Sequence, residues 1–250
     1  MRHQGPHHAL HAALLAVVLS AAILPSALRA QDSPNGPVGA FAGVHLMLAF
    51  PQGDFKSKVS DIGFGGNFEL GYAPPDMPIA AGLQLGYVVY GSKTYTTQFS
   101  EFVPVSVDVD VTNSIGLLHL FVRMMPPKGD VRPYVEGLLG GSLFTTSSTV
   151  KNRNTSEEIA GDNKNSDVAF SYGGSAGLLI RVWSDKTNEN QPVDIFLDAR
   201  VRYFYGGNAE YYTNAAVSQQ SNGKVVFDKN NLTSSKTDFV TGQLGVTFKF

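Results

Sequence analysis

Apolar and polar residues alternate with a period of two along most of the chain, and this pattern predicts β-strands. From Val38 onward no segment shows the 3.6-residue period of an amphipathic helix. About eight stretches alternate. We expect strands at Val38–Phe50, Ile62–Tyr72, Ile79–Gly91, about Val105–Met125, Val131–Phe144, Val168–Arg181, Val193–Phe204 and Val240–Phe250.

The seventh stretch separates the two faces most clearly. Its odd-numbered residues from Val193 to Tyr203 are apolar, while the even-numbered ones from Asp194 to Phe204 are two aspartates, two arginines and two phenylalanines. Successive side chains of a strand point to opposite faces, so one face of this strand is apolar and the other is mixed.

The fourth stretch departs from a single alternation. Val105, Val107, Val109 and Val111 are odd-numbered, whereas Leu118, Leu120, Val122 and Met124 are even-numbered. One extra residue in a strand moves every later side chain to the other face. We therefore predict a β-bulge or register break near residues 113–116.

The connections decide between a soluble sandwich and a barrel. Three are short: Pro74–Pro78, Pro126–Asp130 and Ser184–Pro192. Four are longer and polar: Pro51–Ser60, Ser92–Pro104, Thr145–Ser166 and Gly206–Lys236. Compact soluble domains rarely contain such loops, but outer-membrane barrels combine short periplasmic turns, long extracellular loops and an even strand number. The pattern therefore favours a membrane barrel.

Composition agrees with this architecture. The chain has 250 residues, no Cys, 26 Gly, 16 Phe and 10 Tyr, and only 16% charged residues. The absence of Cys excludes a disulfide scaffold and a Cys-ligated metal site. The net charge of −2 gives no basic surface for nucleic acid.

The N-terminus has the features of a secretory signal peptide. Arg2 and a His-rich stretch precede an apolar core from Ala12 to Leu24, which Pro25 and small residues follow. The core is too short to span a bilayer as a helix. We expect a signal peptide at residues 1–30, cleaved after Ala30, then a short periplasmic lead-in at 31–37 and the barrel at 38–250.

Aromatic residues gather where the predicted strands end. They are Phe50, Phe64, Tyr87, Phe170, Tyr203 and Phe239 on the loop side, and Tyr72, Trp183, Phe248 and Phe250 on the turn side. Such rings settle at membrane–water interfaces, since one part of the ring system is apolar and the other is wet.

The leader, the alternating strands, the Pro51–Phe55 sequence PQGDF and the terminal GVTFKF resemble the bacterial outer-membrane β-barrel superfamily, in particular its small OmpA/OmpX-type and opacity-type barrels. The resemblance implies an all-β fold, an eight-stranded antiparallel up-and-down transmembrane β-barrel. It also implies that Phe248 and Phe250 form the assembly signal that the barrel-assembly machinery reads, and that the barrel contacts outer-membrane lipid.

Inward-facing positions carry both signs of charge. The expected lumen network comprises Glu69, Arg123, Glu136, Arg181, Asp194, Asp198, Arg200, Arg202 and Lys249. We expect Arg181 to pair with Asp194 or Asp198, Asp198 with Lys249, and Arg200 and Arg202 to reach Glu69 or Glu136. Eight strands enclose a lumen that side chains just fill, here including Phe41, Met47, Tyr90, Phe196 and Phe204, so a paired, closed plug is favoured over a narrow or gated channel.

Function is less constrained than fold. His45 and His119 point inward, but the run GLLHLFVR has no Ser beside His119, so we expect no catalytic residues. The sequence implies no cofactor or metal. The first hypothesis is a non-enzymatic outer-membrane protein whose long loops meet an extracellular ligand. The alternatives are a small diffusion channel and, third, a lipid-modifying enzyme.

Overall fold

The computed structural model describes residues 39–59, 61–98, 106–152, 158–185, 193–212, 217–219, 225–227 and 232–250. The expected signal peptide, its cleavage site after Ala30 and the lead-in to residue 37 lie outside these ranges.

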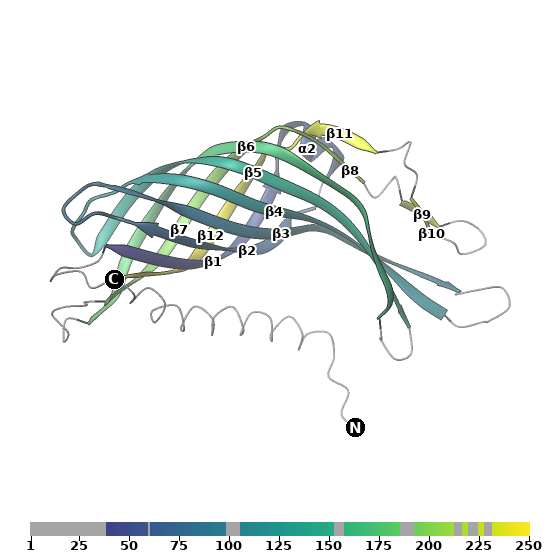
Figure 1. The fold of residues 1–250 in the computed structure, drawn as a ribbon, viewed down its shortest axis with the longest axis horizontal. Coiled ribbons are helices and arrows are strands. Elements are labelled where there is room, and N and C mark those ends of the chain that lie inside the picture. Colours follow the sequence, from purple (N-terminus) through teal and green to yellow (C-terminus); the bar gives the residue numbers. More distant parts are fainter. Residues whose placement is uncertain are drawn as a thin grey trace, which may run out of the picture.

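The described residues form a closed barrel in which eight antiparallel strands follow the order β1-β12-β7-β6-β5-β4-β3-β2 (Figure 1). Each strand pairs with its neighbour in the chain, and β1 closes the barrel on β12. The strands are β1 (Ala40–Pro51), β2 (Gly63–Tyr72), β3 (Ile79–Gln98), β4 (Ser106–Met124), β5 (Val131–Asn152), β6 (Glu158–Asp185), β7 (Val193–Gly206) and β12 (Phe239–Lys249). The predicted up-and-down topology is confirmed.

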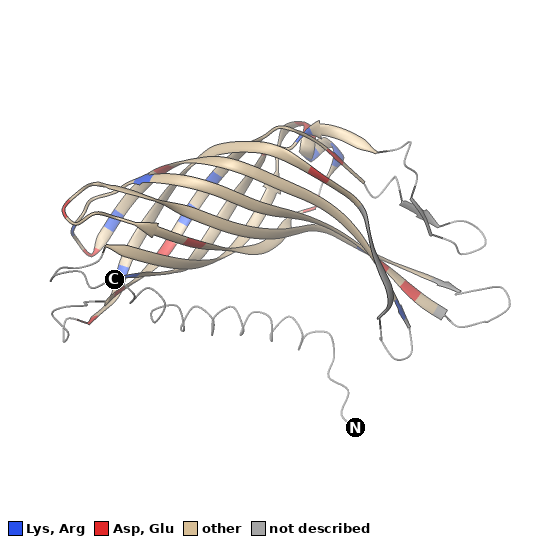
Figure 2. Cartoon of the chain, in the orientation of Figure 1, with Lys and Arg blue, Asp and Glu red and all other residues tan. Residues whose placement is uncertain are grey.

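The barrel is apolar outside and polar inside. Large apolar side chains are exposed around the wall, among them Leu46, Leu85, Leu118, Leu120, Val122, Val135, Leu139, Val182, Val201 and Leu244. Most of the wall is free of charged residues in Figure 2, and the charged side chains near mid-height lie buried inside the barrel. An apolar band of this extent is unstable in water and stable in lipid. The fold is therefore a transmembrane β-barrel.

Four strands continue well beyond this band, into segments expected to be loops. Within Ser92–Pro104 the structure has strand to Gln98, and within Thr145–Ser166 it has strand to Asn152 and again from Glu158. Cross-strand hydrogen bonds help to hold the projecting part, for example from Thr94 to Asp110 (2.7 Å). The polar composition misled the prediction, because a sheet outside the membrane also exposes a polar face.

The predicted bulge in the fourth strand is wrong. Pairing of β4 with β5 is continuous from Val107 to Met124, and odd-numbered residues of β4 stay on the inner side throughout. The register shift lies instead in β3, where Tyr90 is the extra residue between Val89 and Gly91. Val109 and Val111 are apolar because they pack with Tyr95 and Tyr212 in a cluster outside the apolar band.

Two further connections contain structure that the alternation did not predict. The Pro51–Ser60 connection contains helix α2 (Gly53–Lys58), and the Gly206–Lys236 connection contains β8 (Asn208–Tyr211), β9 (Val217–Gln219), β10 (Val225–Phe227) and β11 (Thr233–Lys236). No helix in the described part of the chain is long and apolar enough to cross a membrane.

The C-terminus lies at the end of the barrel that carries the short turns (Figure 1). The Gly39 amide donates to the Phe250 carbonyl (2.7 Å), which fastens the start of β1 to the end of the chain. Asp76 holds a left-handed turn conformation (φ 62°) and pairs with Lys128 of the next turn (2.7 Å).

Candidate functional site

The barrel interior has three layers. An apolar layer near the short turns consists of Phe41, Ala73, Ala80, Phe121, Met125, Tyr134, Leu138, Leu179 and Phe196. A second apolar layer near the loops contains Met47, Phe55, Val88, Tyr90, Ile115, Leu117, Phe144, Phe204, Tyr211 and Phe239. Charged side chains lie between them. We treat this charged layer as the candidate site, because buried charges persist only where they are paired or used.

Arg123 of β4 is the centre of the layer on the turn side. Its Nη2 donates to both Glu69 carboxylate oxygens (3.0 and 3.1 Å), and its Nε donates to Glu136 (3.0 Å). The guanidinium also lies over the Tyr134 ring, 4.4 Å from the centroid. Two nitrogens of the guanidinium thus serve two carboxylates while its plane covers a ring, and the planar fork of arginine allows this where the ammonium of lysine does not.

Arg200 and Arg202 of β7 complete the layer. Arg200 donates to Glu69 (2.6 Å) and Asp198 (2.5 Å), while Arg202 donates to Glu136 and to the Gln84 carbonyl. Among the described lumen residues at this level, three arginines therefore face three carboxylates, and all six side chains are buried. The network has no net charge when His45 is neutral.

Not every residue expected in the network belongs to it. Glu69, Arg123, Glu136, Asp198, Arg200 and Arg202 come together in the buried layer. Arg181, Asp194 and Lys249 lie at the rim on the turn side. There Arg181 pairs with Asp130 and with Asp194 (3.4 Å).

The expected pair of Arg181 with Asp194 or Asp198 forms with Asp194, whereas the expected pair of Asp198 with Lys249 is wrong. Asp198 contacts neither Arg181 nor Lys249 in the described structure, because β12 pairs Lys249 with Asp194 and leaves Asp198 opposite Gly245. Asp198 instead accepts hydrogen bonds from Tyr134 (2.7 Å) and Arg200. The long-range partners expected for Arg200 and Arg202, Glu69 and Glu136, are correct.

The terminal and interfacial aromatics also have clear positions. Phe250 lies at the turn-side rim, where its amide donates to the Ala40 carbonyl (2.8 Å), and Phe248 is half-buried opposite Ala42 and Ile195. The placement of Phe239 at the membrane interface is wrong. Its side chain lies inside the barrel and stacks on Phe204, 4.7 Å between centroids, because its odd-numbered position faces inward.

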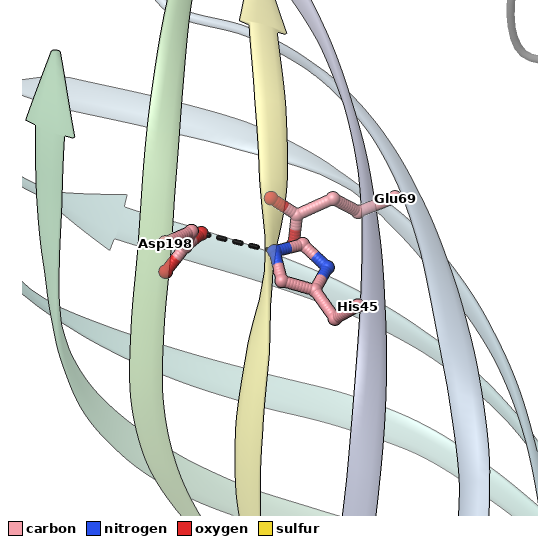
Figure 3. A group of neighbouring side chains, drawn as sticks. All are labelled: His45, Glu69 and Asp198. Carbon is pink, nitrogen blue, oxygen red and sulfur yellow. Dashed lines mark hydrogen bonds and ion pairs between the residues drawn. The ribbon is translucent and has the colours of Figure 1, made fainter. Parts of the chain in front are cut away.

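His45, Glu69 and Asp198 have the composition of a metal site. One ligand atom from each lies within 4.8 Å of the others, and His45 Nε2 is 3.1 Å from Asp198 Oδ2 (Figure 3). However, the Arg200 guanidinium hydrogen-bonds all three residues. A metal ion would have to displace this cation and would leave the layer with excess positive charge. The cluster therefore fits a resident arginine and not a metal ion.

Tertiary structure brings a serine to His119 that the local sequence lacks. Ser171 Oγ of β6 lies 2.6 Å from His119 Nε2, and both side chains are fully buried. Gln84 determines what this pair can do. The Gln84 carbonyl accepts from Asn67 (3.2 Å) and Arg202, so the Gln84 NH2 group faces His119 Nδ1 (3.4 Å).

His119 Nδ1 must therefore accept a hydrogen bond, and the ring proton belongs on Nε2. That nitrogen donates to Ser171, which lies 2.9 Å from the Ser142 hydroxyl. A hydrolytic dyad needs the opposite direction, with an unprotonated nitrogen that takes the serine proton. The pair thus lacks both the proton direction and the access to substrate that catalysis requires.

Sequence reasoning missed several members of this interior. Tyr134 and Gln84 occupy inward positions of the alternation, but nothing in the sequence marks either residue as a hydrogen-bond partner of the charged side chains. Phe55 lies in a connection whose polar composition predicts a loop, yet it fills the outer apolar layer with its ring edge-to-face against Tyr90 (5.5 Å) and Tyr211 (5.4 Å). The only sequence signal for Phe55 is an aromatic residue inside a polar connection.

Comparison with known proteins gives similarity of structure alone. No protein-family model and no curated sequence matches the chain. Neisserial surface protein A is similar over 86% of this chain and 99% of its own, with 15% identity and a TM-score of 0.43. The attachment invasion locus protein Ail of Yersinia pestis, solved with a heparin analogue, is similar over 84% and 97%, with 15% identity and a TM-score of 0.39. A major outer membrane protein of Thermus thermophilus is similar over 84% and 99%, with 13% identity and a TM-score of 0.39.

Proposed function

We propose that this chain is a non-enzymatic outer-membrane protein, in which a closed barrel anchors a folded outer sheet that contacts an extracellular ligand. The observation that carries the proposal is the closed lumen. A charge-neutral layer of ion pairs lies between two apolar layers, so neither ions nor solutes have a continuous polar path.

Ion pairs satisfy every carboxylate of the charged layer, while the buried Nε atoms of Arg200 and Arg202 have no hydrogen-bond partner in the described structure. Every carboxylate in it accepts from at least one guanidinium, and Asp198 accepts from Tyr134 as well. Removing one partner of such a buried pair costs about 3–5 kcal/mol, because the other charge is left buried and unpaired. This arrangement supports a structural plug over a diffusion channel.

The projecting sheet supplies the surface for contact. Beyond the apolar band, β3 carries Thr94 and Thr96 and β4 carries Asp108 and Asp110 on the exposed side, with Thr–Asp hydrogen bonds of 2.7 and 2.8 Å across the two strands. The inner side packs Val109 and other apolar side chains into a small core. Strands that are already paired lose less conformational entropy on binding than an unstructured loop, which supports a role in surface recognition.

Export and assembly belong to the same proposal. Residues 1–30 would direct the chain through the inner membrane and be cleaved after Ala30. The barrel-assembly machinery would read Phe248 and Phe250, and outer-membrane lipid would surround the apolar band. The chain would have no nucleic-acid partner.

Two measurements test the proposal. Planar-bilayer recording of the purified barrel should show no steady conductance, whereas an open pore would favour the channel alternative. Protease added to intact cells should cut the outer segments, which contain Lys151, Arg153, Lys164, Lys224 and Lys229, and leave the barrel protected. Cutting only after the envelope is broken would reverse the orientation and overturn the surface role.

A further inference from the structure

Two elements close the loop-side end of the barrel, and they are held in different ways. The ribbon of β8 and β11 is hydrogen-bonded to the barrel, since the Glu210 amide donates to Asp167 of β6 (2.7 Å). The short helix α2 lies beside β11 (Figure 1). In the described structure no hydrogen bond joins residues 53–58 of α2 to another element, and the bond from the Gln52 amide to the Asp238 carbonyl (2.9 Å) precedes the helix. Buried apolar side chains therefore hold α2 in place.

Phe55 is the buried residue of α2, and an aromatic box encloses its ring. The box consists of Tyr90 of β3, Phe144 of β5 and Tyr211 of β8, which lie edge-to-face around Phe55 at centroid distances of 5.5, 5.9 and 5.4 Å. All four rings are at most 3% exposed. Edge-to-face contacts of this kind favour an aromatic ring over an aliphatic group. The box is thus a site for one ring, and Phe55 occupies it.

One wall of the box has a polar group that Phe55 leaves unsatisfied. The Tyr90 hydroxyl is buried and has no hydrogen-bond partner in the described structure, whereas the Tyr211 hydroxyl bonds with Ser235 (2.7 Å). A buried hydroxyl without a partner destabilises the folded state. A ring that carries one hydroxyl or carbonyl group supplies the missing partner, and the phenyl ring of Phe55 does not. The three walls are uncharged, so a charged ligand would lose its hydration without gaining an ion pair.

From the aromatic box, the unpartnered hydroxyl and the attachment of α2, we propose that the loop-side end of the barrel binds a small neutral aromatic compound with one hydroxyl or carbonyl group. The ligand takes the place of the Phe55 ring and bonds with Tyr90, while α2 moves away from the mouth. The charged layer below is unchanged, so the lumen stays closed. This site goes beyond the proposed function, and only the outside as the source of the ligand rests on the proposed orientation.

Limited trypsin digestion of the purified barrel in lipid nanodiscs tests the displacement. Lys56 and Lys58 are exposed on α2, but trypsin needs an extended chain, so cleavage there reports release of the helix. The probe is para-fluorophenol, and para-fluorotoluene is its apolar counterpart of similar shape. In the wild type, para-fluorophenol should raise cleavage at both lysines about tenfold with a saturable dose dependence. Cleavage at Lys128, which is exposed in a turn at the other end of the barrel, should not change.

Two variants separate the displaced ring from the hydroxyl, with binding followed by fluorine NMR. Phe55→Ala empties the box, so para-fluorophenol should bind about tenfold more tightly than to the wild type, because the ligand no longer competes with the protein's own ring. Tyr90→Phe keeps the wall and removes its hydroxyl. It should bind para-fluorophenol about tenfold less tightly than the wild type does and leave the binding of para-fluorotoluene unchanged.

Three results would overturn the proposal. The first is wild-type cleavage at α2 that does not respond to para-fluorophenol at any concentration that leaves the barrel folded, since α2 would then be a fixed cap. The second is equal acceleration at Lys128, which would show general unfolding, and the third is an unchanged preference for the phenol in Tyr90→Phe. The first two use the wild type, so they stand even if Phe55→Ala does not fold. Because the charged layer lies below the box, the conductance test of the proposed function has the same outcome whether or not this site exists.

Discussion

Arg123 offers the sharpest test of the charged layer. In Arg123→Leu the leucine replaces a guanidinium that makes hydrogen bonds of 3.0 and 3.1 Å to Glu69 and 3.0 Å to Glu136. The variant leaves three carboxylates facing two arginines in a region that water does not reach. We expect the free energy of unfolding to fall by about 3–5 kcal/mol, the usual cost of removing one partner of a buried ion pair.

Urea unfolding in lipid vesicles, followed by the shift between folded and unfolded bands in cold gel electrophoresis, measures this change. Glu136→Gln should restore neutrality, so the double variant Arg123→Leu/Glu136→Gln should be more stable than the sum of the two single losses by about 1 kcal/mol or more. Lys128→Leu removes an exposed partner of Asp76 and should leave the unfolding midpoint unchanged.

A loss of less than about 1 kcal/mol in Arg123→Leu, as expected of an exposed pair, would contradict the burial of this ion pair. Two single losses that add without coupling would contradict the interaction between Arg123 and Glu136. Either result would contradict a buried, coupled ion pair between Arg123 and Glu136.

Three further predictions concern other parts of the molecule. Leu120→Arg on the lipid face should cost about 2–4 kcal/mol in the same unfolding assay, and a harmless arginine there would contradict the outward assignment. Deleting Phe250 should lower the amount of barrel in the membrane fraction of cells far more than it lowers the stability of refolded protein; normal insertion would show that the terminal aromatic is not read. Burial raises the pKa of Asp110, but hydrogen bonds from Lys151 and Thr94 outweigh it and lower the pKa below its ordinary value of 3.8. Its stabilising bonds are therefore complete above that value and are lost as pH falls through the lowered pKa, which hydrogen exchange at the tip of the β3–β4 hairpin should detect.

Strong alternation let the sequence determine the barrel itself. Each strand has to present one face to lipid and one to a packed interior, so a period of two is required over the whole membrane thickness. Strands such as β7, with Leu197 and Val201 outside and Asp198 and Arg200 inside, were therefore assigned correctly. The same face assignment supplied the six charged residues of the buried layer.

Tertiary structure decides which side chains pair with one another inside the lumen. Residues such as Arg200 and Glu69 lie on strands far apart in the chain, and strand register determines which side chains share a height. Register depends on the closure of the whole barrel, and no local pattern contains it. For this reason Lys249 was expected beside Asp198 but lies at the rim, while Ser171 meets His119 without any local signal.

Tertiary structure also decides the secondary structure of the segments outside the membrane. Within the membrane, lipid on one side and the packed interior on the other impose an alternating pattern on every residue of a strand. Outside the membrane a strand needs only one covered face, and its other face can carry polar residues in contact with water. The stretches at Ser92–Gln98 and Thr145–Asn152 therefore have the composition of loops and form strands because β3, β4, β5 and β6 pair with one another. Phe55 likewise closes the outer layer only because folding brings Tyr90, Phe144 and Tyr211 around it.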